Sequence, residues 1–95
     1  MDSEVWQLNP RFFKCLDNLW GKHSIDRFAS MNNCQLTSFD SRWWDPRTEA
    51  VDCLQLPDEE WREEHSWCNS PWSLLPALLQ QRKISGAAAA IIAPV

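Results

Sequence analysis

The last third of the chain carries signals for a strand, a helix and a second strand in immediate succession, and this order narrows the folds open to it. HSWCN, residues 65–69, predicts a short strand that ends at Asn69. Ser73 then caps the leucine-rich pattern of a helix that Gly86 would end. Residues 87–95 combine four alanines, which favour helix, with IIAPV, which favours a buried strand; their position after a helix favours the strand. Strand–helix–strand is the repeating unit of a parallel sheet, so the sequence predicts an α/β fold.

A second well-marked element lies near the N-terminus. Asn9 can cap a helix, Pro10 suits its first position, and Gly21 lies where a left-handed residue would end it. Between them, apolar residues recur at helical spacing and predict one stripe on an amphipathic helix: Phe12, Cys15, Leu16, Leu19 and Trp20. We expect this helix to pack on one face of the sheet, after an N-terminal tail or linker formed by residues 1–8.

The segment between these two regions carries weaker signals. Residues 23–30 predict a short strand that runs into a loop, and the polar residues 31–44 predict a loop. Asp45-Pro46 is a helix-start signal, so a short helix is expected to begin there. The acidic residues after Pro57 predict either a solvated helical turn or a loop.

Size and charge limit the functions open to the chain. Its 95 residues allow at most one small domain, and a formal net charge of -4 has the wrong sign for a free-standing nucleic-acid binder. Any contact with DNA would need a local basic face or a neighbouring domain. The chain has 7 Trp and no Tyr, and because each indole N–H needs a partner, several of these rings are expected at boundaries or clefts.

The four cysteines, Cys15, Cys34, Cys53 and Cys68, are far apart and never form a CxxC pair. The N-terminus does not resemble a signal peptide, so we interpret them as reduced, partly buried thiols of an intracellular protein, cytoplasmic or nuclear; a disulfide framework is the lesser alternative. The two histidines are expected at the surface or at a boundary, and neither has zinc-ligand spacing to a cysteine, so no metal is expected. The C-terminal apolar stretch is too short to span a bilayer, so no membrane contact is expected.

Asn69-Ser70-Pro71-Trp72 follows the predicted strand directly, at the end where open α/β sheets bind ligands. The pattern Asn-x-Pro-aromatic suits methyl transfer to the exocyclic amine of a base. An Asn oxygen and a neighbouring backbone carbonyl can accept the two amine protons, proline fixes the backbone, and the aromatic ring stacks on the flipped base. The alternative is an ordinary turn, with Trp72 only covering the helix.

A second motif precedes it in the chain: DRFAS, Asp26 to Ser30, has the form Asp-x-Phe-x-small at a predicted strand end. Together, IDRFASMNN, SRWWDPRTEAVD and NSPW resemble the DNA adenine methyltransferase-like (Dam-like) domain of DIRS-type, tyrosine-recombinase retroelements. In those polyproteins the domain follows the reverse transcriptase and RNase H domains, and a recombinase is the element's other enzyme. The resemblance covers nearly the whole chain from Trp6 onward, and it places a Dam-like domain over residues 9–95.

The resemblance implies a Rossmann-like methyltransferase fold, a partial parallel sheet with flanking helices, with S-adenosylmethionine as cofactor and DNA as partner. Four residues match the methyl-donor motif and would line the cofactor pocket: Asp26, Phe28, Ala29 and Ser30. Four match the catalytic Asn/Asp-Pro-Pro-aromatic motif: Asn69, Ser70, Pro71 and Trp72. Asp52 lies between the two motifs and is a weaker candidate for a contact to the adenosyl group.

The chain departs from this family pattern in three respects. Its donor loop has no glycine, where methyltransferases need close approach of the backbone to the cofactor. Ser70 replaces the first proline of the catalytic motif. The sheet would also be only partly built, so we expect a domain shortened at its C-terminal end, inactive in isolation.

Other candidate sites carry less weight. Asp40 with Asp45, or the acidic cluster of residues 59–64, could be a metal-dependent nuclease site, but acidic runs are usually solvated. A serine nucleophile at Ser70 or Ser73 lacks the Gly-x-Ser-x-Gly elbow. The basic–aromatic stretch RWWDPR, residues 42–47, could stack on a base, but the preferred interpretation is that its tryptophans cover a small core.

Two functions of different class therefore follow from the sequence. The first is adenine methyl transfer, alone or within a longer parent protein. The second is a non-catalytic module that spaces or docks the neighbouring reverse transcriptase, RNase H and recombinase domains of a polyprotein, or an expressed remnant with no selected activity. Binding of S-adenosylmethionine separates the two.

Overall fold

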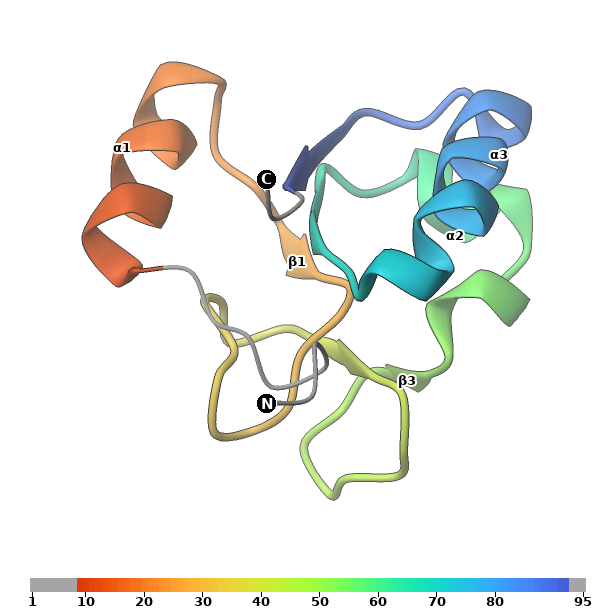
Figure 1. Ribbon diagram of the computed structural model, residues 1–95, viewed down its shortest axis with the longest axis horizontal. Coiled ribbons are helices and arrows are strands. Elements are labelled where there is room, and N and C mark those ends of the chain that lie inside the picture. Colours follow the sequence, from red (N-terminus) through yellow and green to blue (C-terminus); the bar gives the residue numbers. More distant parts are fainter. Residues whose placement is uncertain (1–8, 93–95) are drawn as a thin grey trace.

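In the computed structural model, which describes residues 9–92, short parallel strands lie between one helix on one side and two on the other (Figure 1). The strands are β1 (Ile25–Asp26), β2 (Asp40–Ser41), β3 (Ala50–Val51), β4 (Ser66–Asn69) and β5 (Ala89–Ile92). The helices are α1 (Pro10–Leu19), α2 (Asp58–Arg62) and α3 (Leu75–Ser85), with single 3-10 turns η2 (Cys53–Gln55) and η3 (Trp72–Leu74). The chain thus has the mixed helices and parallel strands of an α/β protein, as predicted. The expected tail, residues 1–8, and residues 93–95 of the expected last strand lie outside the described residues.

All strand pairings are parallel. β4 lies between β1 and β5, with Ser66 opposite both Ile25 and Ala89. β2 pairs with β3, and a parallel bridge from Asp26 to Phe39 joins β1 to the start of β2. Across this bridge, the strands follow one another in the order β3-β2-β1-β4-β5.

The sheet has a small core on each face. On one face Trp67 contacts α1 through Phe13, whose ring meets the indole edge-on at a centroid distance of 4.6 Å. On the other face the core lies under α2 and α3 and consists of Cys53, Trp61, Cys68, Leu78 and Ala87. Neighbouring residues of a strand point to opposite faces, so Trp67 of β4 belongs to the core under α1 and Cys68 to the core under α2 and α3.

Helix α1 begins and ends as predicted. The Asn9 side chain accepts a hydrogen bond of 2.9 Å from the backbone N–H of Arg11, Pro10 is the first helical residue, and Gly21 has a φ of 93°. The predicted apolar stripe, however, is wrong for four of its five residues, and Leu16 alone among them is half-buried and packs against the core. The buried residues of α1 are Phe13 and Asp17, whereas Phe12, Leu19 and Trp20 are exposed.

Asp17 is buried because it has a buried partner. Its carboxylate accepts hydrogen bonds of 2.7 Å from both the backbone N–H and the ring Nδ1 of His23. The His23 ring is itself buried and stacks on the ring of His65 at a centroid distance of 4.1 Å. The expectation of a position at the surface or at a boundary is therefore wrong for His23, whose buried side chain connects α1 to the sheet.

The C-terminal strand–helix–strand unit confirms the prediction, with one correction. Residue Leu74, not Ser73, is the cap of α3, because η3 occupies the residues expected to form the cap and first turn. The helix ends at Gly86, whose φ of 69° is the left-handed conformation that favours glycine. The acidic segment after Pro57 forms the helical turn α2, whose Trp61 is fully buried.

Two predictions for the middle of the chain are wrong. β2 lies within the segment expected to be a loop, and β3 replaces the helix expected after Asp45. Asp45 does begin a turn, since its backbone carbonyl accepts a hydrogen bond of 3.1 Å from the N–H of Thr48. The chain then pairs with β2 through backbone hydrogen bonds of 2.8 Å, from the N–H of Glu49 to the carbonyl of Phe39 and from the N–H of Asp52 to the carbonyl of Ser41.

Candidate functional site

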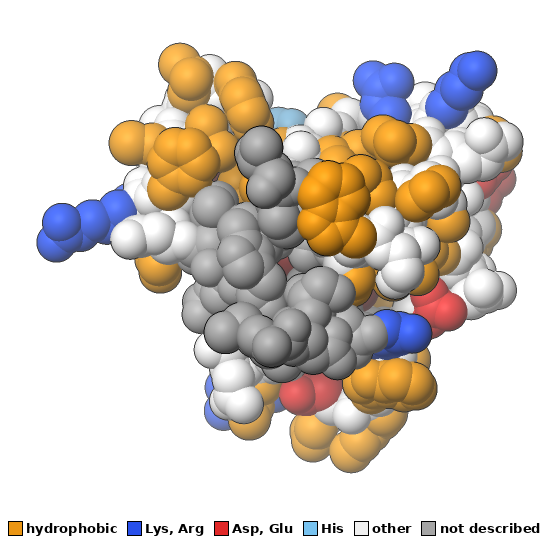
Figure 2. All heavy atoms as spheres, viewed as in Figure 1, with side chains coloured by type: hydrophobic (Ala, Val, Ile, Leu, Met, Phe, Trp, Pro, Cys, Tyr) orange, Lys and Arg blue, Asp and Glu red, His pale blue; other side chains and the backbone are white. Residues whose placement is uncertain are grey.

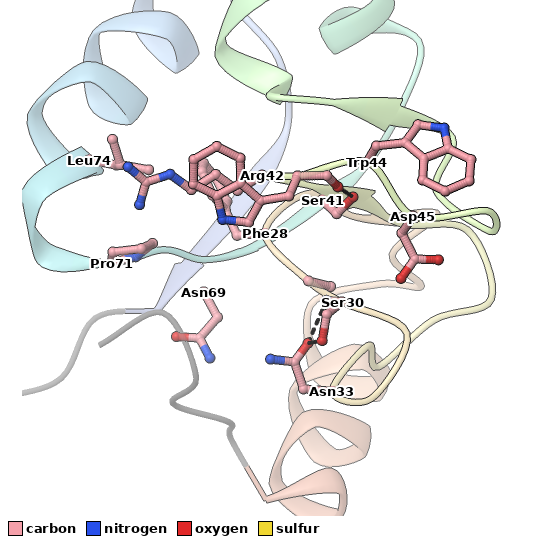
Figure 3. A pocket seen from close by; sticks show the side chains of 12 residues that line it. Phe28, Ser30, Asn33, Ser41, Arg42, Trp44, Asp45, Asn69, Pro71 and Leu74 are labelled. Atoms are coloured by element: carbon pink, nitrogen blue, oxygen red, sulfur yellow. Dashed lines mark hydrogen bonds between the residues drawn. The ribbon is translucent and has the colours of Figure 1, made fainter. Parts of the chain in front are cut away.

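A cavity of about 370 Å³ opens where β1, β2 and β4 end, and it brings the two predicted motifs together (Figure 3). Phe28, Ala29 and Ser30 line it from the loop after β1, and Asn69 and Pro71 line it from the end of β4. The remaining lining residues are Asn33, Ser41, Arg42, Trp43, Trp44, Asp45 and Leu74. The volume is within the range of about 300–1,000 Å³ typical of small-molecule sites. It has room for one nucleoside-sized group.

The loop after β1 is held by its own side chains. Asn33 Oδ1 accepts hydrogen bonds from the backbone N–H and the hydroxyl of Ser30, at 2.6 and 3.1 Å. On the strand side, the N–H of Ala29 donates to the carbonyl of Asp40 at 3.0 Å. These contacts fix a wall that presents Cβ atoms and an amide group, where a glycine loop would present bare backbone.

Asp26 lies behind this wall and does not line the cavity. It is buried, and its Oδ2 accepts a hydrogen bond of 2.9 Å from the backbone N–H of Gln35, which closes the loop. Burial raises the pKa of Asp26 to about 6, opposed by the backbone hydrogen bonds from Gln35 and Phe28. Asp26 therefore positions the loop, whereas the motif match would have it contact the cofactor.

Two of the four residues of the second motif line the cavity, and the other two lie beside it. Asn69 and Pro71 line the cavity, and Asn69 Oδ1 is buried without a hydrogen-bond partner among the described residues. Ser70 is buried beside them, and its hydroxyl also has no partner within residues 9–92. Trp72 is 54% exposed at the start of η3 and does not line the cavity. A buried amide oxygen without a partner favours a ligand that donates a hydrogen bond.

The end of β2 supplies a third wall that the motifs did not predict. Trp43 and Trp44 are 70% and 76% exposed, so the interpretation that they cover a core is wrong. The Arg42 guanidinium lies over the Trp43 ring at 5.3 Å from its centroid. The basic–aromatic composition was visible in the sequence, but nothing in it indicated that this segment joins the two motifs.

Two predicted or considered acidic positions lie elsewhere. Asp52 is exposed, has a φ of 56° and does not line the cavity; its N–H donates to the carbonyl of Ser41. Asp40 is buried in an ion pair with Arg27, so it cannot form an open carboxylate pair with Asp45. Within residues 9–92, no group of three or more His, Cys, Asp or Glu side chains could hold a metal ion.

Comparison of the chain with protein-family models, with curated proteins and with solved structures finds no match in any of the three. None of the helices in the described part of the chain has the length and apolar character needed to cross a membrane. All four cysteines are free thiols, with Cys53 and Cys68 buried.

Proposed function

We propose that the chain is a Dam-like, Rossmann-like methyltransferase domain from a DIRS-type retroelement polyprotein, and that its cavity binds the adenosyl part of S-adenosylmethionine. One observation carries this proposal. The residues of both motifs, Phe28 to Ser30 and Asn69 with Pro71, line one cavity at the carboxyl ends of neighbouring parallel strands.

The strand order supports this location. With the bridge from Asp26 to Phe39 included, the order β3-β2-β1-β4-β5 is that of the first five strands of a doubly wound sheet. In such sheets the chain reverses direction across the sheet between β1 and β4, and ligands bind in the crevice at that point. The connection from β1 to β2 has no helix here, so the unit is a reduced form of that fold.

Asn69 is the residue best placed to act on an exocyclic amine. Its buried Oδ1 can accept one amine proton, and the backbone carbonyl beside Pro71 would accept the other. S-adenosylmethionine would supply an electrophilic methyl group, and the hydrogen bonds would direct the amine lone pair towards it. Trp72, half-exposed beside the motif, would stack on a base held at the cavity mouth.

Other features favour binding over efficient transfer. Ser70 occupies the place of a proline that would fix the acceptor geometry, and its buried hydroxyl has no partner among the described residues. The Ser30–Asn33 contacts also put side chains where the family has close backbone approach. We therefore propose that the isolated chain binds the cofactor but transfers its methyl group slowly or not at all. The alternative function is a non-catalytic module of a reverse transcriptase–RNase H polyprotein.

Calorimetric titration with S-adenosylmethionine tests the cofactor proposal, after circular dichroism has shown that the chain is folded. We expect a dissociation constant of about 1–100 μM, which corresponds to roughly 5.5–8 kcal/mol. Ala29→Leu, which fills the cavity, should abolish binding, and Ala88→Leu, at an exposed position outside it, should not. An absence of heat from the folded chain would refute the cofactor proposal and leave the module.

A transfer assay then separates the two functions. Adenine-containing oligonucleotides are incubated with the chain and labelled S-adenosylmethionine, and N6-methyladenine is measured by mass spectrometry. Product that disappears in Asn69→Ala would establish a methyltransferase. Cofactor binding without product would establish a binding module whose catalytic motif has decayed.

A further inference from the structure

We infer that Trp43 and Trp44 form a stacking platform for the bases of an unpaired nucleic-acid strand, beside the cavity. The platform is defined as these two residues with Arg42 and Arg47, all in the loop between β2 and β3. The inference rests on the proposed function in one respect: a strand lying on the platform would deliver one of its bases to the cavity.

Exposure of the two indoles is the first observation. Trp43 and Trp44 are the most exposed of the tryptophans in the described residues, at 70% and 76%. Hydrophobic side chains gather at the bottom of the molecule in Figure 2, where Figure 1 places the loop between β2 and β3. Each indole has a large apolar face that folding leaves in water, and exposed aromatic faces of this size at a cavity rim favour contact with a ligand or partner.

The loop that carries them is ordered by hydrogen bonds at both ends. Ser41 Oγ donates to the carbonyl of Trp43 at 2.5 Å, and the Arg47 N–H donates to Asp45 Oδ1 at 3.0 Å. Thr48 further connects the loop to β3, because its hydroxyl donates to the carbonyl of Ala50 at 2.6 Å. The rings are thus presented from a fixed backbone, and binding would cost less conformational entropy than on a free loop.

The charges beside the rings favour nucleic acid over an apolar peptide. Arg42 lies over the Trp43 ring, and Arg47 is exposed at the other end of the loop. The two cations flank the two aromatic rings, with Asp45 between them, and form a small basic–aromatic surface on a chain whose net charge is -4. Stacking supplies the affinity and the arginines hold the phosphates, which is the pattern of proteins that bind single strands without sequence preference.

Continuity with the cavity decides between an unpaired strand and a duplex. Trp43 and Trp44 also line the cavity, and Figure 3 shows the Trp44 ring pointing outward on the side opposite Asn69. A duplex hides its base faces in the stack, whereas an unpaired strand offers them to the indoles without the cost of unstacking. The Trp43 ring, over which the Arg42 guanidinium lies, is on the Leu74 side of the cavity, and the Trp44 ring is on the Asp45 side (Figure 3), so a strand that stacks on both rings would cross the cavity mouth.

Fluorescence anisotropy with a labelled eight-nucleotide DNA strand tests the platform, using the full chain. The unpaired strand is expected to bind at least tenfold more tightly than the same sequence as a duplex. Trp43→Ala/Trp44→Ala removes two stacking faces and should weaken its binding by about 30-fold or more, and an abasic strand should bind equally poorly. Trp20→Ala, which removes an exposed indole from α1, is the matched control and should bind as the unmodified chain does.

Two further measurements keep the test decisive. Trp43→Phe/Trp44→Phe keeps the ring faces and should retain most of the binding even where the alanine variant is destabilised. With two arginines on the platform, log Kd should rise with log[salt] with a slope of about 1.4. A slope of 4 or more, equal binding of duplex, or full binding by the alanine variant would overturn the inference, as would preference for an apolar peptide.

The cofactor titration on the unmodified chain distinguishes this failure from that of the proposed function. Strand binding without S-adenosylmethionine binding would keep the platform and refute the cofactor proposal. Cofactor binding without strand binding would refute the platform alone.

Discussion

Arg27 and Asp40 form an ion pair in the interior of the protein: Nη1 of the arginine donates to Oδ2 of the aspartate at 2.8 Å, and both side chains are buried. The same guanidinium donates from Nε to the Ser66 hydroxyl at 3.1 Å and from Nη2 to the carbonyl of Glu60 at 3.1 Å. It also lies over the Trp61 ring, at 4.7 Å from the centroid. One side chain of the loop after β1 therefore connects β2, β4 and α2.

Removal of one partner of this pair should be strongly destabilising. Arg27→Met would leave the Asp40 carboxylate buried and unpaired, and we expect a loss of about 3–5 kcal/mol in the free energy of unfolding. The matched control is Glu59→Gln, which breaks the exposed pair with Arg62 but keeps the hydrogen bond from Arg62 to the Ser85 carbonyl, and it should cost no more than about 1 kcal/mol. Urea titration of both variants measures the difference. Equal losses would show that the buried pair contributes no more than a surface pair.

The buried carboxyl of Asp26 predicts a pH dependence of stability. Burial raises its pKa to about 6, so the folded chain holds this proton more tightly than the unfolded chain does. The free energy of unfolding should therefore fall as the pH rises from about 4 to 6, by up to about 1.4 kcal/mol per pH unit. Asp26→Asn should remove this part of the decline. Burial also raises the pKa of Asp40, so a residual slope of the same sign should remain. Urea titration at several pH values measures the free energy of unfolding of both chains. The same pH dependence in the unmodified chain and in Asp26→Asn would show that Asp26 does not cause the decline.

Two buried serines provide a matched test of hydrogen-bond satisfaction. Ser66 accepts a hydrogen bond from Arg27, whereas the hydroxyl of Ser70 has no partner among the described residues. Ser66→Ala leaves a buried donor unpaired and should cost about 1–3 kcal/mol. Ser70→Ala removes an unsatisfied hydroxyl and should be neutral or slightly stabilising. Thermal unfolding should thus show a lower melting temperature for Ser66→Ala, and an unchanged or slightly higher one for Ser70→Ala, than for the unmodified chain. A large loss in Ser70→Ala would reveal an unrecognised partner.

The four thiols should react with a thiol reagent in three groups. Cys15 is exposed and should react first in the folded chain, and the half-buried Cys34, whose pKa is raised by burial and by the charge of Asp26, should follow more slowly. Burial raises the pKa of Cys53 and Cys68 strongly, so these two should react only after denaturant is added. Stopped-flow measurement with a chromogenic thiol reagent counts how many thiols react in each phase. Four equally reactive thiols in native buffer would mean that the core is open.

The elements predicted well from the sequence are those with local signals at their ends. Asn9, Pro10 and Gly21 delimit α1, and Gly86 ends α3, because caps and left-handed residues act within one turn of the helix they limit. The β-forming residues of HSWCN predict β4 directly, and β5 is predicted from its position after α3. The two-residue strands β2 and β3 could not be, since a strand of that length shows no periodicity. β2 is held instead by the Arg27–Asp40 pair, whose partners are 13 residues apart in sequence.

The candidate site likewise contains residues that could be predicted from the sequence and residues that could not. The sequence placed the motifs around Phe28 and Asn69 at strand ends, and parallel pairing of β1 with β4 brings those ends together. Asn33 and Leu74 carried no signal, because their place in the wall depends on loop geometry. The Trp43–Trp44 pair did carry a signal, but composition alone could not decide between core and cavity rim. For Asp26 the motif match predicted a place beside the cofactor pocket, but it could not predict that the side chain points into the protein interior.

The packing face of α1 gives the last prediction, and it tests the point at which sequence and structure disagree most directly. Helical spacing predicts a stripe that includes Phe12, yet Phe13 is the ring that meets Trp67, with 7% exposure against 53%. Phe13→Ala should therefore cost about 3–5 kcal/mol, because it opens a cavity against a buried indole, while Phe12→Ala should cost less than about 1 kcal/mol. Urea unfolding of this adjacent pair measures both. The reverse ranking would mean that α1 is rotated about its axis and packs through the predicted stripe.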